Sequence, residues 1–470
     1  MREYCGVIGV FTSNPKNLMP YLYEGLCAVQ HRGQEAVGIS VFNGELKTYK
    51  SKGLVSESKI FELDDVGTIG IGHTRYSTTG NTSLHNAHPV ELTSKYGLKY
   101  SFAFNGNIGN YEELMQKIDK QKLDTTCDAE VLGYALGENL PKIDVNEHFR
   151  LNGEMIKGAF AGVMLMTGDN PQLIAIRDPY GFRPLCIGKT DDAYFVSSES
   201  VAFSNSYMGG ELIRDVKPGE VVTIDETGIK SNQVFSLNRQ ALCMFEYVYF
   251  SRPDSIINNI PVYEAREKLG RLLARDYPVD GDIVIPVPDS GRSAATGYAI
   301  ESGIPLKEGF QKDRYRYKRS FILDDNNERM SVAKNKLNPM SFMIKDKKVI
   351  VVDDSIVRGV NASFVKDLKN AGAKEVHVRI SCPPIIEWCP YGIDFYRGEL
   401  IARKYWEKKE KHEEICNSVS KEIGADSLYY NTLDNLVEAL GVFKSDLCTA
   451  CLTAEYPHKI EIQTKSQRKR

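Results

Sequence analysis

The sequence predicts two domains of different fold class, an α+β domain of antiparallel strands followed by an α/β domain with a parallel sheet. In the first half of the chain, short apolar runs are separated by Gly, Asn and Asp turns, which is typical of strands joined as hairpins. Past about residue 245, apolar β-branched runs alternate with helical stretches, which indicates βαβ units. A chain of 470 residues is long enough for two or three domains.

The first domain is expected to extend over residues 5–230. Its short runs end at turn residues, as strands in hairpins require. We expect strands at 5–11, 38–42, 67–71, 100–105, 162–166 and 193–197, and helices near 18–30 and 129–137.

The second domain is expected to extend over 231–470, with 231–241 as the connector. Its strands follow from apolar runs and its first helix from a stretch of small residues. In order along the chain, we expect a strand at 282–288, a helix at 290–302, a strand at 347–352, a helix at 362–371 and a strand at 375–380.

The composition and net charge of the chain indicate which kinds of molecule it is not expected to bind and in which compartment it is expected. A net charge of -3 gives no electrostatic argument for binding to nucleic acid or to an anionic membrane. No run of about 18 apolar residues is present, so no transmembrane span is expected. The first residues lack the apolar region and cleavage site of a signal peptide, which predicts a cytoplasmic protein. Its ten cysteines are then expected to be thiols or metal ligands rather than disulfides.

Cys5 stands at the start of an apolar strand pattern and has two interpretations. A cysteine at the start of a buried strand is commonly a core residue. A cysteine at a free amino terminus is instead a nucleophile with its own base, because an α-amino group with a pKa of about 8 accepts the thiol proton. The second interpretation requires cleavage between Tyr4 and Cys5, and it predicts a propeptide of residues 1–4.

Four short motifs carry a resemblance. Cys5-Gly-Val-Ile-Gly, His31-Arg-Gly-Gln-Glu, Gly72-His-Thr-Arg-Tyr-Ser and Asn105-Gly-Asn occur in this order. Together they resemble the class II glutamine amidotransferase domain, which implies an N-terminal nucleophile fold with two antiparallel sheets between helices (αββα). The resemblance implies that Cys5 is the catalytic nucleophile and that the Asn105 side chain and the Gly106 N–H form the oxyanion hole.

The same resemblance assigns glutamine binding to Arg75, Tyr76 and Asp128. A guanidinium pairs well with the α-carboxylate of glutamine, and a carboxylate pairs with its α-ammonium. Taken alone, Arg75 could be a surface ion pair and Asp128 the N-cap of the helix at 129–137, and both roles could coexist for Asp128. The segment 178–185 also matches these amidotransferases, and we interpret it as architecture.

The stretch 347–363 is an apolar strand, two acidic residues and a loop that opens a helix. Ligands of parallel sheets lie at the carboxyl ends of strands, and a helix amino terminus favours anions. With Val-Val-Asp353-Asp354-Ser355 the stretch resembles the type I phosphoribosyltransferase signature. The resemblance implies that Asp353 and Asp354 contact ribose hydroxyls or Mg²⁺. It places the 5′-phosphate in a cradle formed by Ser355, Ile356, Val357, Arg358, Gly359, Val360, Asn361 and Ser363.

Two further segments extend this resemblance. Residues 286–291 look like the pyrophosphate loop, with Ser290 near the metal, although a structural proline-rich turn is the alternative. Residues 311–322 carry five basic residues among aromatics and resemble the family's lid, with Lys312, Arg314 and Arg319 over the diphosphate. A solvated face and a site for single-stranded nucleic acid are the other interpretations of this run.

A CxxC at Cys448 and Cys451 is ambiguous by itself between redox, metal and structural roles. With Cys243 and Cys389 it resembles the branch of the family that carries a [4Fe–4S] cluster. Cys382 is a rival for Cys389, and the Tyr-Gly-Ile-Asp context favours Cys389. Zinc on the same four thiolates, or four unliganded thiols, are the alternatives.

Taken over nearly the whole chain, the motifs resemble the glutamine phosphoribosylpyrophosphate amidotransferases. The resemblance implies an enzyme that uses glutamine, phosphoribosyl pyrophosphate and Mg²⁺, forms homo-oligomers, expected to be tetramers, and is inhibited by purine nucleotides. Glucosamine-phosphate synthase and asparagine synthetase share the first domain but would lack the loop after Asp354. A non-catalytic sensor of phosphoribosyl pyrophosphate is the alternative, and it would be expected to lack Cys5 or the lid.

Overall fold

The computed structural model describes residues 5–76, 83–118, 123–235, 239–312, 337–393, 398 and 400–458. The expected propeptide, residues 1–4, lies outside the described residues, as do Arg314 and Arg319 of the expected lid. The side chains of Val360 and Asn361 are also outside this description. Among the described residues, no helix combines the length and the apolar character that crossing a bilayer requires.

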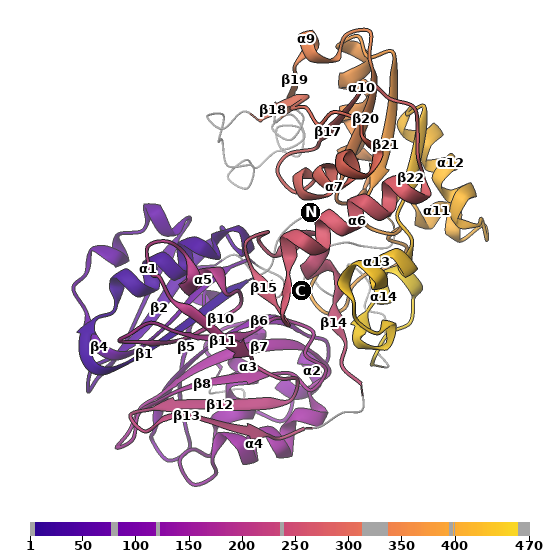
Figure 1. The fold of residues 1–470 in the computed structure, drawn as a ribbon. Coiled ribbons are helices and arrows are strands. Elements are labelled where there is room, and N and C mark those ends of the chain that lie inside the picture. Colours follow the sequence, from indigo (N-terminus) through magenta and orange to yellow (C-terminus); the bar gives the residue numbers. More distant parts are fainter. Residues whose placement is uncertain are drawn as a thin grey trace.

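The first domain is built on two antiparallel sheets (Figure 1). One has the order β11-β9-β10-β1-β4-β2-β3, and the other has the order β13-β12-β8-β7-β6-β5. The strands of the first sheet are β1 (Gly6–Asn17), β2 (Ala36–Phe42), β3 (Leu46–Lys52), β4 (Val66–Arg75), β9 (Cys186–Lys189), β10 (Tyr194–Ser197) and β11 (Glu211–Asp215). Those of the second are β5 (Val90–Thr93), β6 (Lys99–Ile108), β7 (Gly158–Met166), β8 (Gln172–Arg177), β12 (Glu220–Asp225) and β13 (Gly228–Gln233).

Helices cover the outer face of each sheet and complete four αββα layers. The first sheet is covered by α1 (Met19–Ala28) and α5 (Val201–Ser204), and the second by α2 (Tyr111–Met115), α3 (Asp128–Gly137) and α4 (Val145–Asn152). The two-residue period of a strand divides the side chains between layers. On β1, Val7 enters the core between the sheets, while Ile8 enters the core under α1. The expected fold of the first domain is confirmed.

The second domain has a four-stranded parallel sheet, with β17 (Ile283–Pro286), β20 (Lys348–Asp353), β21 (Glu375–Ile380) and β22 (Ser427–Tyr430) in that order. The expected parallel sheet is therefore confirmed. Its longer helices are α6 (Val262–Asp276), α7 (Arg292–Ser302), α10 (Ser363–Asn370), α12 (His412–Ile423) and α13 (Leu433–Leu440). Short elements complete it, namely a π-helical turn (Glu246–Phe250), α9 (Ser341–Ile344), α11 (Arg403–Trp406), α14 (Ala450–Thr453) and the strands β15 (Ile256–Ile257), β16 (Ile260–Pro261), β18 (Phe310–Lys312) and β19 (Leu337–Pro339).

Helices α6 and α7 pack closely because each has a glycine at the contact. A Cβ on Gly270 would lie 1.9 Å from the carbonyl oxygen of Ala294, and one on Gly297 would lie 1.9 Å from that of Glu267. A larger residue at either position would separate the helices. This packing holds α7, which follows the expected pyrophosphate loop, against the rest of the domain.

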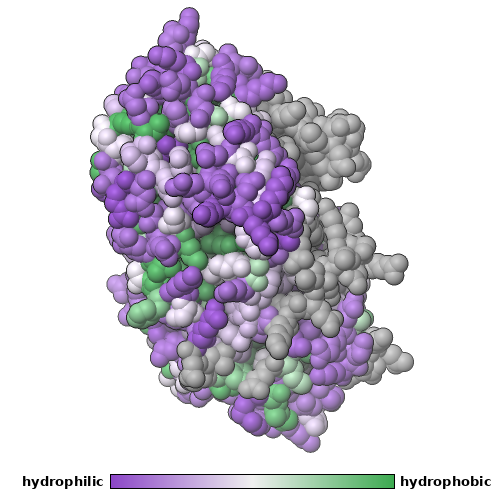
Figure 2. All heavy atoms as spheres, turned by 90° about the vertical axis from the view of Figure 1, so that its right-hand side faces the viewer, coloured by the Kyte–Doolittle hydropathy of each residue, from purple (hydrophilic) through white to green (hydrophobic). Residues whose placement is uncertain are grey.

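The last described elements of the chain lie at the junction between the domains (Figure 1). There β23 (Leu447–Cys448) pairs in parallel with β14 (Leu242–Cys243), so that Cys448 lies opposite Cys243. Figure 2 shows a face with many hydrophilic residues, on which one group of apolar residues gathers near the middle and a smaller one lies at the lower edge.

Candidate functional site

The first candidate site is formed by Cys5 and the end of β4. Strand β1 begins directly after Cys5 and pairs with β4, with Gly6 opposite Thr74, which places Cys5 beside Arg75 and Tyr76. The backbone N–H of Tyr76 donates to Cys5 Sγ at 3.5 Å, and Sγ donates to the Tyr76 carbonyl oxygen at 3.4 Å. The thiol is therefore fixed by the backbone of the strand next to it.

Burial dominates the electrostatics of this thiol. Burial raises the pKa of Cys5 to about 12, and the charges of Asp128 and Glu35 act in the same direction, while the Tyr76 backbone hydrogen bond and Arg75 oppose them. A thiol in this environment stays protonated at neutral pH. It needs a base beside it before it can act as a nucleophile.

Asn105 and Gly106 lie on β6, in the opposing sheet. Ala103 shares the core between the sheets with Val7, so the two-residue period turns Asn105 toward the sheet that carries Cys5. Asn105 is fully buried, and neither polar atom of its side chain has a hydrogen-bond partner among the described residues. Gly106 has a φ of 149°, and a Cβ there would lie 1.8 Å from the Ala159 carbonyl oxygen, so this position requires glycine.

Asp128 and Arg75 complete this site, and both are only 3% exposed. Asp128 accepts a hydrogen bond from the Ile108 N–H at 3.3 Å, and burial raises its pKa to about 6. Two alternatives are wrong. Asp128 is the first residue of α3, whose N-cap is Cys127, and Arg75 is not on the surface.

The second candidate site lies at the carboxyl end of β20. Asp353 and Asp354 are buried there, and the pKa of each is raised, chiefly by burial and, for Asp353, also by the neighbouring charge. The side chains of Ser290 and Ser355 both hydrogen-bond to Asp354. The structure therefore brings three residues of the expected metal site, Ser290, Asp353 and Asp354, together.

The expected phosphate loop leads from Asp354 into α10. Ile356 and Val357 have buried side chains in the domain core, so only their backbone can face a ligand. The Val357 carbonyl accepts the Ile401 N–H at 3.0 Å, which fixes the loop to the following segment. A 3-10 turn (Gly359–Ala362), which includes Gly359, Val360 and Asn361, then leads to Ser363, the first residue of α10. Arg358 precedes this turn.

Lys312, at the end of β18, is the one expected lid contact within the described chain. Its Nζ lies 2.5 Å from Asp289 Oδ2 in the expected pyrophosphate loop. This ion pair joins the first described residue of the expected lid to the loop that includes Ser290.

The four expected cluster ligands, Cys243, Cys389, Cys448 and Cys451, line one small cavity with Arg183 and Tyr391. Cys382 does not line it; its backbone N–H instead donates to the Asp354 carbonyl oxygen at 2.8 Å. In the described part of the chain, no three His, Cys, Asp or Glu side chains are close enough together to hold a single metal ion.

Burial raises the pKa of all the cavity thiols for which a shift is resolved, to about 11 for Cys243. Arg183 has no exposed surface, and its charge opposes this shift at Cys243 and Cys448. It belongs to the segment 178–185, which the sequence led us to interpret as architecture. Its side chain in fact faces the cysteine cavity.

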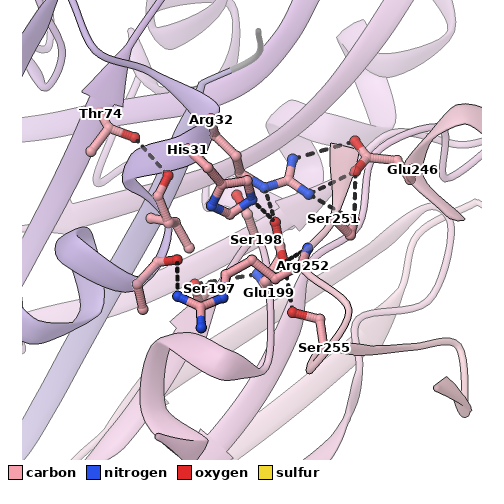
Figure 3. Close-up of polar contacts among 12 residues, drawn as sticks. His31, Arg32, Thr74, Ser197, Ser198, Glu199, Glu246, Ser251, Arg252 and Ser255 are labelled. Carbon is pink, nitrogen blue, oxygen red and sulfur yellow. Dashed lines mark hydrogen bonds and ion pairs between the residues drawn. The ribbon is translucent and has the colours of Figure 1, made fainter. Parts of the chain in front are cut away.

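A buried ion network between the domains was also missed by sequence reasoning (Figure 3). Arg32 pairs with Glu199 in its own domain and donates from Nη2 to Glu246 Oε2 in the second domain at 2.6 Å. Glu199 accepts from Ser255 Oγ of the second domain at 2.6 Å. The presence of Arg32 in the motif His31-Arg32-Gly33 was the only local signal, and it did not reveal the partner.

Comparisons with known proteins agree with this layout. Residues 73–205 match the glutamine amidotransferase domain family. Proteins named amidophosphoribosyltransferase from Methanocaldococcus jannaschii (39% identical, 98% of each chain covered) and Pyrococcus horikoshii (43% identical, 97% of each) are similar over nearly their whole length. The solved glutamine phosphoribosylpyrophosphate amidotransferase from B. subtilis, complexed with ADP and GMP, is 36% identical with a TM-score of 0.87, and the match covers 99% of this chain and 100% of that one. The chain belongs to the amidophosphoribosyltransferase family, the glutamine-dependent enzymes of the first step of purine biosynthesis.

Proposed function

We propose that Cys5 is the nucleophile that takes the amide nitrogen from glutamine, after removal of residues 1–4. The observation that carries this proposal is the pairing of a buried thiol with a facing Asn105 whose amide has no partner among the described residues. The freed α-amino group of Cys5 accepts the thiol proton, and sulfur attacks the amide carbon. Asn105 Nδ2 and the Gly106 N–H donate to the oxyanion, ammonia leaves with the proton, and water hydrolyses the thioester to glutamate.

Arg75, Tyr76 and Asp128 bind the amino-acid end of glutamine in this proposal. The Arg75 guanidinium pairs with the α-carboxylate and Asp128 with the α-ammonium. Both side chains are buried next to Cys5. The low dielectric there strengthens the attraction between each side chain and the oppositely charged group of glutamine once glutamine is bound.

At the second site, Asp353 and Asp354 contact the ribose hydroxyls, and the loop 355–363 presents backbone N–H groups to the 5′-phosphate. Two adjacent buried carboxylates with raised pKa values suit a divalent cation, because a cation removes their mutual repulsion. Ser290, Asp353 and Asp354 would hold Mg²⁺, which would neutralise charge on the departing pyrophosphate. Lys312, with Arg314 and Arg319, covers the diphosphate as a lid.

We further propose that Cys243, Cys389, Cys448 and Cys451 hold a [4Fe–4S] cluster. Zinc requires its ligands about 2.0–2.3 Å from one point, whereas the four cysteines line a shared cavity without forming a group that could hold a single ion. When bound, the cluster would fasten the end of the chain to the start of the second domain. Absorption near about 400 nm, with iron and sulfide analysis of anaerobic protein, tests this assignment.

The similarity to the B. subtilis enzyme with ADP and GMP supports purine nucleotides as feedback inhibitors of this chain. Assembly as a homotetramer and a cytoplasmic location are proposed on the same family grounds.

The proposed roles are tested by pyrophosphate release in the wild type and in Cys5→Ala, each with glutamine and with ammonium chloride. We expect the variant to lose glutamine-dependent release and to keep ammonia-dependent release. Glutamine-dependent release of pyrophosphate by Cys5→Ala would show that Cys5 is not the nucleophile. A wild type that binds phosphoribosyl pyrophosphate but releases no pyrophosphate with either donor would favour the non-catalytic sensor.

A further inference from the structure

The oxyanion strand β6 also makes a contact outside its own domain. Asn105 and Asn107 lie on the same face of β6, because they are two residues apart. Asn107 is 6% exposed, and its Nδ2 donates to the Pro390 carbonyl oxygen of the second domain at 2.9 Å. The Gly106 peptide therefore stands between an unpartnered Asn105 amide and a residue tied across the domain junction.

The segment that receives this hydrogen bond is part of the cysteine cavity. Cys389, Pro390 and Tyr391 all line that cavity. The first domain contacts the segment a second time, because Arg183 Nη2 donates to the Tyr391 carbonyl oxygen at 2.6 Å and the Phe182 and Tyr391 rings stack with centroids 4.1 Å apart. Residues 389–391 thus touch the thiol cavity on one side and the oxyanion strand on the other.

We propose that Asn107 is a positioning residue that holds the oxyanion donors of β6 against residues 389–391, so that an intact four-cysteine site is needed for efficient glutamine hydrolysis. An oxyanion hole works only if its donors are fixed before the reaction, and a shift of about 1 Å can cost about 100-fold in rate. Free ammonia needs no oxyanion hole, so its use at Asp353 and Asp354 should not depend on this contact. This inference rests on the proposed role of Asn105 and Gly106.

The test compares Asn107→Ala and the isosteric Asn107→Asp, which lacks the N–H donor, with Asn110→Ala. Asn110 makes the same kind of hydrogen bond, from Nδ2 to the Met155 carbonyl oxygen at 2.8 Å, but within the first domain. For both Asn107 variants we expect glutamine-dependent kcat to fall about 10- to 100-fold with little change in glutamine KM, because substrate contacts remain. Ammonia-dependent kcat should be unchanged, and Asn110→Ala should match the wild type in both assays.

The Cys389→Ser variant tests whether glutamine hydrolysis depends on the four-cysteine site. We expect it to reproduce the selective loss of glutamine-dependent activity, and we expect the Asn107→Ala/Cys389→Ser double variant to lose no more than the more impaired single variant, since both changes release the same segment. Slower labelling of Cys5 by an electrophilic diazo-ketone analogue of glutamine should accompany the loss in each variant.

Two outcomes would overturn the inference. The first is an unchanged ratio of glutamine-dependent to ammonia-dependent activity in the Asn107 variants, whether both activities are retained or both fall equally. The second is additive losses in the double variant. A wild type without glutamine-dependent activity, or a Cys5→Ala variant that retains it, would instead count against the proposed function. The two failures are therefore distinguishable.

Discussion

At the scale of single residues, burial determines the protonation of Cys5 and Asp128 in the proposed glutamine site. It is the largest influence on both Cys5 and Asp128, and it raises the pKa of each, to about 12 and about 6. The thiol therefore depends on a neighbouring base, and the carboxylate is ionised only above about pH 6. In the proposed function, the α-ammonium group of glutamine would restore the ionised form of Asp128 on binding.

The pH dependence of kcat/KM for glutamine should follow the protonation of Asp128. Its raised pKa means that the carboxyl group is protonated below about pH 6, so kcat/KM for glutamine should fall as pH decreases through that value. Asp128→Asn should lower kcat/KM about 10- to 100-fold at neutral pH, the value of a charge-assisted hydrogen bond, and should remove this inflection. An inflection near pH 6 that persists in Asp128→Asn would assign it to another group.

Gly106 should not tolerate a side chain. In Gly106→Ala the new Cβ meets the Ala159 carbonyl oxygen at a φ that favours glycine, so β6 and the proposed oxyanion donors must move. We expect glutamine-dependent activity to fall at least about 100-fold, with ammonia-dependent activity retained. Gly44→Ala is the control, because Gly44 also has positive φ, but a Cβ there meets nothing within 4 Å. Equal behaviour of the two variants would show that backbone strain, not the contact with β7, determines the loss.

At the scale of elements, ion pairs join the π-helical turn Glu246–Phe250 to the first domain. Glu246 is buried, yet the Arg32 and Arg183 guanidiniums hold its pKa below its usual value against the opposing effect of burial. The two domains thus share a desolvated ion network in which each charge needs its partners (Figure 3).

Arg32→Met should therefore destabilise the protein by about 3–5 kcal/mol, because Glu199 and Glu246 would lose their shared partner in a buried site. Arg150→Met is the control, since the Arg150–Glu147 pair is exposed and such pairs contribute about 0–1 kcal/mol. Chemical denaturation at neutral pH measures both.

The pH dependence of stability checks the same network. Because the folded pKa of Glu246 is lowered, its stabilisation is complete above the unfolded value of about 4.3 and disappears as pH falls further. The wild type should lose its advantage over Arg32→Met in that acidic range. A constant difference between them at all pH values would contradict the role of these charges.

At the scale of the whole molecule, sequence motifs were enough to propose the residues of two candidate sites, but not to predict the contacts that join the two domains. Cys5, Asn105, Asp353 and Asp354 lie in short motifs, and strand pairing or a strand end then places them. The hydrogen bond from Asn107 to Pro390 joins residues 283 positions apart, and Arg32 and Glu246 are 214 apart. No local pattern encodes such separations.

Two alternatives that the sequence left open, a surface ion pair for Arg75 and an N-cap for Asp128, could be excluded only with the structure. The burial of Arg75 and the start of α3 at Asp128 depend on how β4 and α3 pack, which side-chain type alone does not reveal. The expected boundaries of helices and strands agree with the structure to within one or two residues in the second domain's main elements. The helix expected at 290–302 is α7 (Arg292–Ser302), and the strand expected at 347–352 is β20 (Lys348–Asp353).

If Cys243, Cys389, Cys448 and Cys451 hold the proposed cluster, its loss should loosen the carboxyl-terminal segment that contains Cys448 and Cys451. Cys448 and Cys451 stand on the segment that pairs with β14 and donates from the Tyr456 hydroxyl to the Trp388 carbonyl oxygen at 2.8 Å. Cys451→Ser should abolish the absorption near about 400 nm and increase proteolysis near the carboxyl terminus. Cys416→Ser, at a buried thiol away from the cavity, should leave the absorption unchanged. Wild-type absorption in Cys451→Ser would exclude Cys451 as a ligand.

In the proposed function, nitrogen released at Cys5 is consumed beside Asp353 and Asp354. Glutamine labelled with ¹⁵N in its amide tests this transfer most directly, by mass spectrometry of the phosphoribosyl product together with the pyrophosphate released. We expect one labelled nitrogen in the product for each pyrophosphate, and no labelled product from Cys5→Ala. Pyrophosphate release from glutamine and phosphoribosyl pyrophosphate without ¹⁵N in the product would contradict the proposed transfer.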